Sequence, residues 1–277
     1  MPLSLEDFFE DILGKAQFGL GIDTGTLAEK TGLDRQQIQQ LRRGEPDEAA
    51  LRKIAPHLQL HPDALVASAN KSWYPDIPQV PCLTPFTSSY GDMLVNAYLY
   101  QIPGTSQALL FDTGTDAVPI LQHLRDHNLT LAGICLTHYH PDHIAELLAV
   151  SNATGNPPAW IHKDELVDGA LGIEEGWEHS PAPGFRITAL KTSGHSPAGV
   201  TYLLHLQGQS FPIAMVGDAM FAGSMGGGRH NYQDALENNR KKILTLPDDT
   251  PICPGHGPLS TVGQEKLHNP FFPEFKP

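Results

Sequence analysis

Apolar and polar residues follow different periods in two parts of the chain. Residues 1–71 carry apolar side chains at helical spacing and show almost no strand pattern. Beyond residue 86, short apolar runs that begin at Leu94, Ala108 and Leu131 alternate with amphipathic segments such as residues 117–127, which is typical of an α/β domain. Residues 72–85 contain four prolines, which favour an extended linker. We predict a helical domain over residues 1–71, a proline-rich linker over 72–85 and an α/β domain over 86–277.

A helix-turn-helix spacing lies inside the first part. Ala28 is followed four residues later by Gly32 and six residues after that by Ile38. The small residue lets two helices approach, the glycine can adopt the left-handed conformation of a turn, and the apolar residue anchors the second helix. Asp34 can cap that second helix. Residues 20–70 resemble the DNA-binding domain of the Cro/repressor family, so a small all-α helix-turn-helix domain is expected at the N-terminus.

This resemblance implies a DNA-reading face on the second helix. Arg35, Gln36, Gln39 and Gln40 would contact base edges, and Arg42 and Arg43 would contact phosphates. Charge changes this picture, because residues 1–80 hold 12 acidic and 8 basic side chains and the whole chain has a net charge of -13. Such a surface repels nucleic acid. The acidic balance therefore favours a packing or dimerisation module over a DNA-binding one, and a homodimer is left open.

The densest chemical signal is the string from Thr137 to His143, of the form HxHxDH. It follows an apolar run that we interpret as a buried strand and precedes a helical segment. His138 and His140 are two apart in extended chain, so their side chains can point the same way, and Asp142 begins the helix. Clustered histidines cost stability unless a metal or a carboxylate satisfies them. Imidazole and carboxylate together suit zinc, iron or manganese, so the string predicts a metal site.

Three further motifs repeat one arrangement. His195 in SGHSPAG, Asp218 in VGDAMF and His256 in CPGHGP each follow an apolar strand pattern, and each stands beside a glycine. Glycine lets the backbone turn sharply and approach a metal site closely. Each motif alone is weak, but their order after HxHxDH makes chance a poor explanation.

The order HxHxDH, GH, GD and PGHG resembles the metallo-β-lactamase superfamily over about residues 85–270. The resemblance implies an α/β fold, an αββα sandwich of two mixed sheets with metals at one edge. The strings VNAYLY, FDTG, GDAMFAGSMG and PGHGPLST are most similar to the glyoxalase II-like group.

Site residues follow from the resemblance by motif. Two divalent metal ions are implied, with zinc favoured and iron or manganese as alternatives. The first ion would be held by His138, His140 and His195, and the second by Asp142, His143 and His256. Asp218 would bridge both ions, and Asp142 and Asp218 would take part in catalysis. Asp112 in FDTG would orient a ligand without binding metal itself.

The implied activity is hydrolysis by a metal-bound hydroxide, of a thioester such as a hydroxyacylglutathione or of a related acyl compound. The string GHGPLST stands where glyoxalase II enzymes carry GHEYT, and few cations lie near the C-terminus, so the substrate is left open. Candidate substrate contacts are Arg229, His230, Tyr232 and Lys266. Two alternatives remain. One is a mononuclear iron persulfide dioxygenase that uses His138, His195 and Asp218, and the other is a metabolite-sensing DNA-binding regulator.

Cysteine usage and the N-terminus suggest a compartment. The three cysteines are far apart in sequence and form neither a CxxC site nor a disulfide framework. The first residues are acidic where a signal peptide would be basic, and no apolar run approaches the ~20 residues that span a bilayer. We expect a soluble cytoplasmic protein.

Overall fold

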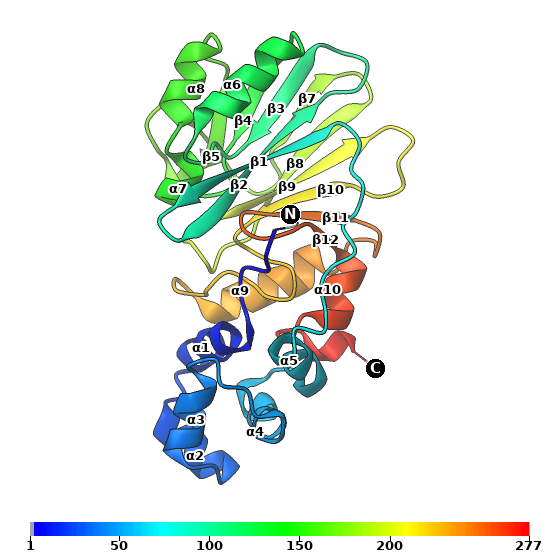
Figure 1. Cartoon of the computed structure of the whole chain (residues 1–277). Helices are drawn as coiled ribbons and strands as arrows, with labels where there is room; N and C mark the ends of the chain where they lie inside the picture. The colour runs from blue at the N-terminus through cyan, green and yellow to red at the C-terminus, as the bar shows by residue number, and fades with distance from the viewer. Residues whose placement is uncertain (1–2, 277) are drawn as a thin grey trace.

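The alternating apolar runs form two sheets of six strands each in the computed structural model, which describes residues 3–276 (Figure 1). The first sheet contains, in spatial order, β1 (Leu83–Tyr90), β2 (Met93–Gln101), β3 (Gln107–Phe111), β4 (Thr130–Cys135), β5 (Ala159–His162) and β6 (Leu171–Ile173). Strands β1 to β3 pair antiparallel, and β3 to β6 pair parallel. The sheet is therefore mixed. The candidate site begins directly after the C-terminal end of β4, in the parallel half of the sheet.

The second sheet also combines parallel and antiparallel strand pairs. Its spatial order is β12 (Ser260–Thr261), β11 (Pro251–Pro254), β10 (Ile213–Gly217), β9 (Val200–Leu206), β8 (Phe185–Lys191) and β7 (Glu178–Ala182). Only β10 and β11 pair parallel, and the other pairs are antiparallel. Because β10 and β11 run the same way, their C-terminal ends lie at one edge.

The inner faces of the two sheets pack against each other. Phe111 and Cys135 of the first sheet lie in one apolar cluster with Tyr202 and Met215 of the second, and all four are buried. Alternate residues of each strand face this layer, as the period of two requires.

Helices cover both outer faces. On the first sheet, α6 (Ala117–Asp126) and α8 (Leu147–Ala153) bury Ile120, Leu124 and Val150 against the strands, and the short α7 (Pro141–Ile144) precedes α8. On the second sheet lie α9 (Tyr232–Asn238), the π turn η3 (Asn239–Ile243), α10 (Val262–His268) and the 3-10 turn η4 (Pro273–Phe275). A further 3-10 turn, η2 (Lys163–Glu165), follows β5. The predicted αββα sandwich is confirmed.

The N-terminal part is all helical. It contains α1 (Phe9–Leu20), α2 (Thr24–Thr31), α3 (Arg35–Leu41), α4 (Glu48–Ile54), the 3-10 turn η1 (Ala55–Leu58) and α5 (Pro62–Ala69). The Asp34 side chain accepts a hydrogen bond from Gln37 N at 2.7 Å and caps α3. Gly32 ends α2 with a φ of 70°, a conformation that suits glycine.

The helical part and the sandwich share one apolar core. Ile12 and Leu13 of α1 belong to the same buried cluster as Met225, Tyr232 and Phe271 of the sandwich. Figure 1 shows α1 and α5 against α9 and α10, below the second sheet. The sequence predicted two regions with different hydrophobic periods. In the structure these two regions share a buried apolar cluster.

The segment between α5 and β1 is fixed to α10. Between α5 and β1 the described chain has neither helix nor strand. Trp73 stacks on His268 with ring centroids 4.9 Å apart. Gln264 exchanges hydrogen bonds with the backbone of Asp76, at 2.7 and 2.9 Å. Within residues 3–276, no helix has the length and apolar character needed to cross a membrane.

Candidate metal centre

Four chain segments meet at one edge of the sandwich and bring seven histidine and aspartate side chains together. They are His138, His140, Asp142 and His143 after β4, His195 after β8, Asp218 after β10, and His256 after β11. These positions are the seven that the motifs predicted as metal ligands. Each segment follows a strand, buried at its end in β4, β10 and β11 and half-buried in β8, so the sheets fix where the side chains begin.

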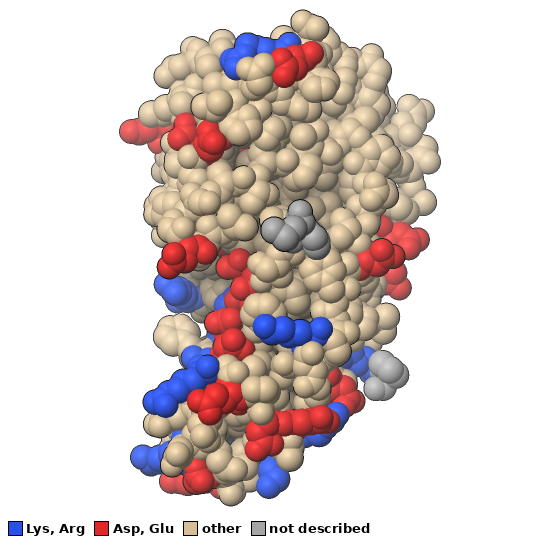
Figure 2. Space-filling view, in the orientation of Figure 1, with Lys and Arg blue, Asp and Glu red and all other residues tan. Residues whose placement is uncertain are grey.

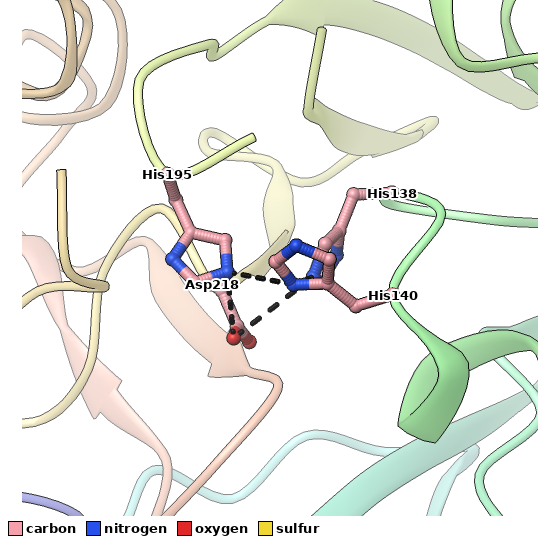
Figure 3. A group of neighbouring side chains, drawn as sticks. All are labelled: His138, His140, His195 and Asp218. Carbon is pink, nitrogen blue, oxygen red and sulfur yellow. Dashed lines mark hydrogen bonds and ion pairs between the residues drawn. The ribbon is translucent and has the colours of Figure 1, made fainter. Parts of the chain in front are cut away.

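The first group contains three histidines and one aspartate (Figure 3). His140 Nδ1 lies 3.0 Å from both His138 Nε2 and His195 Nε2. Asp218 Oδ2 lies 3.4 Å from His195 Nε2 and 4.0 Å from His138 Nε2. Figure 3 shows the rings and the carboxylate pointing towards one point from different segments. One ion could contact all four atoms, since the ligand atoms of the group lie within 4.8 Å of one another.

The second group contains Asp142, His143 and His256, and Asp218 lies between the two groups. His256 Nε2 lies 3.3 Å from Asp142 Oδ2 and 3.4 Å from Asp218 Oδ2. His143 Nε2 lies 3.3 Å from Asp218 Oδ1. Asp218 thus has one or both oxygens within reach of each group, which is the geometry expected of a bridging carboxylate.

Asp112 orients His143. The His143 Nδ1–H donates to Asp112 Oδ2 at 2.8 Å, which directs Nε2 towards the other side chains of the site. The Asp112 carboxylate is itself held, because Thr137 N donates to Oδ1 at 2.7 Å and Thr137 Oγ1 donates to Oδ2 at 2.8 Å. This contact supports the role that the FDTG motif suggested for Asp112.

Backbone carbonyls orient two more rings. His256 Nδ1 lies 2.7 Å from the carbonyl oxygen of Leu94, and His195 Nδ1 lies 3.2 Å from that of Gly227. A carbonyl only accepts, so each Nδ1 carries a proton and each Nε2 is the ring atom that faces the site.

The two ligand groups differ in the pKa values of their histidines. Burial lowers the pKa of His195 to about 4, although Asp218 opposes the shift, and burial also holds the pKa of His138 well below its usual value. In the second group burial acts in the same direction, but Asp218 and Asp112 outweigh it and raise the pKa of His143 to about 10. Asp218 and Asp142 raise the pKa of His256 to about 11. The metal-free protein therefore has neutral imidazoles in the first group and imidazolium–carboxylate pairs in the second.

Two observations indicate that the residues fit metal ions. Among the described residues, His143 Nε2 and Asp218 Oδ1 are buried and lie 3.3 Å apart, yet neither makes a hydrogen bond, an arrangement that a metal ion would satisfy better. In addition, a Cβ on Gly255 would lie 2.2 Å from Asp218 Oδ1 and 2.6 Å from His143 Cε1. The glycine before His256 is therefore required for the close approach of β11 to the site.

Glu165 is a structural residue of the site that the sequence did not reveal. It is buried in η2, where Oε2 accepts from Tyr139 N at 3.1 Å and Oε1 accepts from Ala198 N at 2.5 Å. It ties the HxHxDH loop to the loop that carries His195. In the sequence it stands in the charged run Lys163-Asp164-Glu165, which is typical of an exposed turn, so no local signal identified it.

The candidate substrate residues occupy different environments. Arg229 and His230 are exposed on the loop before α9. Lys266 pairs with Asp248 at 2.6 Å on α10. Tyr232 does not fit the expectation of a pocket residue, because its ring is buried at the junction with α1, where a Cβ on Gly19 would lie 2.1 Å from it.

The candidate DNA-contacting residues lie on and after α3. Arg35, Gln36, Gln39 and Arg43 are exposed, and Gln40 is half-buried. Arg42 differs from the expectation, because its guanidinium lies over Gly14 and donates to the carbonyl oxygen of Glu10. On the face drawn in Figure 2, blue and red side chains are intermixed over the helical part, and the described residues form no continuous basic surface there.

The fold and the two ligand groups define the class of protein. The family model of the Metallo-beta-lactamase superfamily matches residues 90–256, so the chain belongs to this superfamily. The helical part lies outside the match.

Individual relatives and solved structures show which members of the superfamily this chain is similar to. The chain is 32% identical over 210 residues to the probable metallo-hydrolase YqgX of Bacillus subtilis, covering 67% of this chain and 95% of that protein. It is 28% identical over 188 residues to the hydroxyacylglutathione hydrolase GloC of Haemophilus influenzae, covering 59% of this chain and 86% of that protein. Among solved structures, the B3 metallo-beta-lactamase BLEG-1 is similar with a TM-score of 0.58 and 30% identity, over 68% of this chain and 99% of that chain. The chain is accordingly a metallo-hydrolase.

Proposed function

We propose that this metallo-hydrolase cleaves a thioester, such as a hydroxyacylglutathione or a related acyl compound, with two divalent metal ions. The observation that carries the proposal is the position of Asp218 between two ligand groups, within 3.4 Å of His195 on one side and of His256 on the other. The likeness to GloC, which is named a hydroxyacylglutathione hydrolase, supports the thioester class.

The residues of this chain would have the following roles. His138, His140 and His195 would hold the first ion, and Asp142, His143 and His256 the second, with Asp218 shared. When bound, such ions lower the pKa of a water ligand towards 7 and polarise a carbonyl. Asp142 Oδ2 lies 3.3 Å from His256 Nε2. Burial alone would raise the pKa of the Asp142 carboxyl, but the His256 hydrogen bond and the charge of His143 outweigh burial and lower this pKa. The carboxyl would thus be ionised at neutral pH and able to accept a proton.

Zinc is the proposed metal, with iron or manganese as alternatives, because imidazole and carboxylate ligands accept all three. The proposed location is the cytoplasm. Cys82, Cys135 and Cys253 are free thiols in the described structure, which agrees with a reducing compartment.

The first test is hydrolysis of S-lactoylglutathione by the purified full chain, with metal content measured on the same samples. We expect turnover that is lost in His195→Ala together with metal from the first group. His57→Ala, which alters an exposed histidine of η1, is the matched control and should keep wild-type activity. A fully loaded protein without turnover on this and related thioesters would refute the thioesterase proposal.

A mononuclear iron persulfide dioxygenase is the second candidate, and the charge division of the site favours it. If the pairs of His143 and His256 with carboxylates persist, one ion could bind to the first group alone. The residues in question would be His138, His195 and Asp218. Oxygen uptake with glutathione persulfide by the iron-loaded protein, absent from the zinc-loaded protein, would favour this candidate over the hydrolase.

The division into residues 1–71, 72–85 and 86–277 and the helix-turn-helix assignment remain proposals, as do the metabolite-sensing regulator and the homodimer. The engaged guanidinium of Arg42 and the mixed charges of α3 and its surroundings argue against DNA binding. A gel shift with genomic fragments at low salt tests it, and enrichment that is lost in Arg35→Ala and Arg43→Ala would establish a DNA-binding function.

A further inference from the structure

The loop between Asp218 and α9 touches the first ligand group through two glycines. The Gly227 carbonyl oxygen accepts a hydrogen bond from His195 Nδ1 at 3.2 Å. Gly226 fits closely against the same group, because a Cβ there would lie 2.8 Å from His195 Nδ1 and 1.9 Å from the Asp218 carbonyl oxygen. A displacement of residues 226 and 227 would therefore move the acceptor that orients the His195 ring.

Two charged residues of the helical part hold the positions just before these glycines. The Ser224 hydroxyl donates to Asp7 Oδ2 at 2.6 Å, and both side chains are buried. Lys15 of α1 pairs with the same Asp7 oxygen and donates to the carbonyl oxygen of Met225 at 2.8 Å. The segment before α1, α1 itself and the loop thus meet at one polar cluster.

The loop depends on such contacts because its own sequence gives it little stiffness. Residues 223–228 read GSMGGG and lie in neither a helix nor a strand, and glycine loses more conformational freedom on folding than any other residue. Residues 223 and 224 also bond to α10. Within residues 3–276, however, Met225 has no hydrogen-bond partner except Lys15. Lys15 therefore makes the last fixed main-chain contact before Gly226 and Gly227.

The pair of Asp7 and Lys15 contributes direction more than stability. The Asp7 side chain is 8% exposed and that of Lys15 is 20% exposed, so both charges are largely removed from water. The cost of this transfer offsets most of the attraction between them. Charged groups nevertheless form strong hydrogen bonds at defined positions. Here the carboxylate accepts from the side chain of residue 224, and the ammonium group donates to the main chain of residue 225.

We propose that Asp7 and Lys15 are positioning residues of the metal centre, which hold residues 224–227 so that the Gly227 carbonyl keeps the His195 ring oriented. The inference rests on the proposed role of His195 as a ligand of the first ion, and it does not depend on the identity of the substrate. The helical part then orders one ligand of the site in addition to burying apolar surface.

The test removes both charges together, in Asp7→Asn/Lys15→Met, so that neither is left buried and unpaired. NMR on the zinc-loaded full chain, isotope-labelled at the histidine nitrogens, measures how fast each Nδ1–H proton exchanges with water. In the variant the His195 proton should exchange about tenfold faster, because its acceptor is no longer fixed. One equivalent of zinc should also bind about tenfold more weakly in competition with a chromophoric chelator.

His143 is the internal control for a local effect. Its Nδ1–H donates to Asp112 after β3, away from the loop, and should keep its wild-type exchange rate. The matched control variant is Arg52→Met/Asp63→Asn, which removes an exposed ion pair of the helical part in the same manner. It should change neither the exchange of the His195 proton nor the affinity for zinc.

Ser224→Ala keeps the inference testable if the double variant does not fold. It removes one hydrogen bond to Asp7 and leaves the ion pair in place, so the His195 proton should exchange about threefold faster. Unchanged His195 exchange in the zinc-loaded variants would overturn the proposal. Equal acceleration at His195 and His143 would overturn it too, because it would indicate general loosening. A wild-type chain that binds no zinc would refute the proposed metal centre, and the inference with it.

Discussion

At the scale of single residues, hydrogen bonds from Nδ1 orient three of the candidate ligand rings. His195 and His256 each use Nδ1 to donate to a carbonyl oxygen, and His143 uses Nδ1 to donate to Asp112. The sequence indicated all seven side chains that the structure brings together, because histidines and aspartates at fixed spacing beside glycine form a local pattern. It could not indicate Glu165, because that residue matters only through contacts with Tyr139 and Ala198, which lie 26 and 33 positions away.

Replacing Asp112 should weaken the second metal site. In Asp112→Asn the amide nitrogen would face His143 Nδ1, so the two donors would conflict and the ring would tend to place its proton on Nε2. We expect affinity for the second ion to fall by about 10- to 100-fold, measured by competition with a chromophoric chelator. Asp126→Asn, at an exposed position in α6, should have no effect, and unchanged affinity in Asp112→Asn would show that Asp112 has no orienting role.

The two ions should differ in their dependence on pH. His138 and His195 have lowered pKa values and bind without losing a proton, whereas His143 and His256, with pKa values of about 10 and about 11, must each release one. At pH 7 the second equivalent of zinc should release about two protons more than the first. Calorimetry in buffers of different ionisation enthalpy measures this number. Equal proton release in the two steps would contradict the charge division.

At the scale of elements, the loop between Asp218 and α9 is held by its neighbours and not by its own structure. Glu265 of α10 accepts a hydrogen bond from Gly223 N, and Asn269 Nδ2 donates to the carbonyl oxygen of Ser224 at 2.7 Å. Residues 223–228 of this loop read GSMGGG. Its composition does favour flexibility, but the partners that fix it come from α1 and α10, and local composition carries no information about them.

Glu265 should make stability depend on pH. Burial raises the pKa of its carboxyl from 4.5 to about 7, against the hydrogen bonds from Asn269 Nδ2 and Gly223 N. The folded state then holds the proton more tightly than the unfolded state, so stability falls as pH rises from 4.5 to about 7. In metal-free protein, the wild type should lose up to about 3 kcal/mol more than Glu265→Gln between pH 5 and pH 8.

Urea unfolding of both proteins at the two pH values measures this difference. The variant is the proper reference because every other titrating group is shared, and EDTA in all samples removes the contribution of metal binding. Curves for the two proteins that shift in parallel between pH 5 and pH 8 would contradict a raised pKa for Glu265.

At the scale of the whole molecule, one buried cluster contains residues of α1 to α5 together with residues of the second sheet and its helices. The sequence pattern distinguishes the two parts because helical and α/β hydrophobic periods differ. It could not predict that they share a core, since an apolar helix face has the same pattern whether it packs within its own domain or on a neighbouring one. The prolines of residues 72–85 suggested separation, yet Trp73 and Asp76 attach that segment to α10.

A shared core has a consequence for truncation. Removal of residues 1–71 would expose Met225, Tyr232 and Phe271, which are buried in the full chain. Burying a large apolar side chain contributes about 1.5–3 kcal/mol, so the loss of three such contacts should lower the unfolding temperature of residues 72–277 by about 10–20 °C. It should also expose an apolar surface that promotes aggregation.

Scanning calorimetry and ANS binding on the fragment and on the full chain test this expectation, with supply of residues 1–71 in trans as the control. If the exposed surface is the cause, the added helical part should restore part of the lost stability, because it carries the complementary face of the same cluster. A tethered module would behave differently, and its removal would leave the unfolding temperature of the sandwich within about 2 °C of the full chain. Since Glu6 and Asp7 belong to the removed part, the truncated protein should also lose the contacts at Ser224 and Gly257.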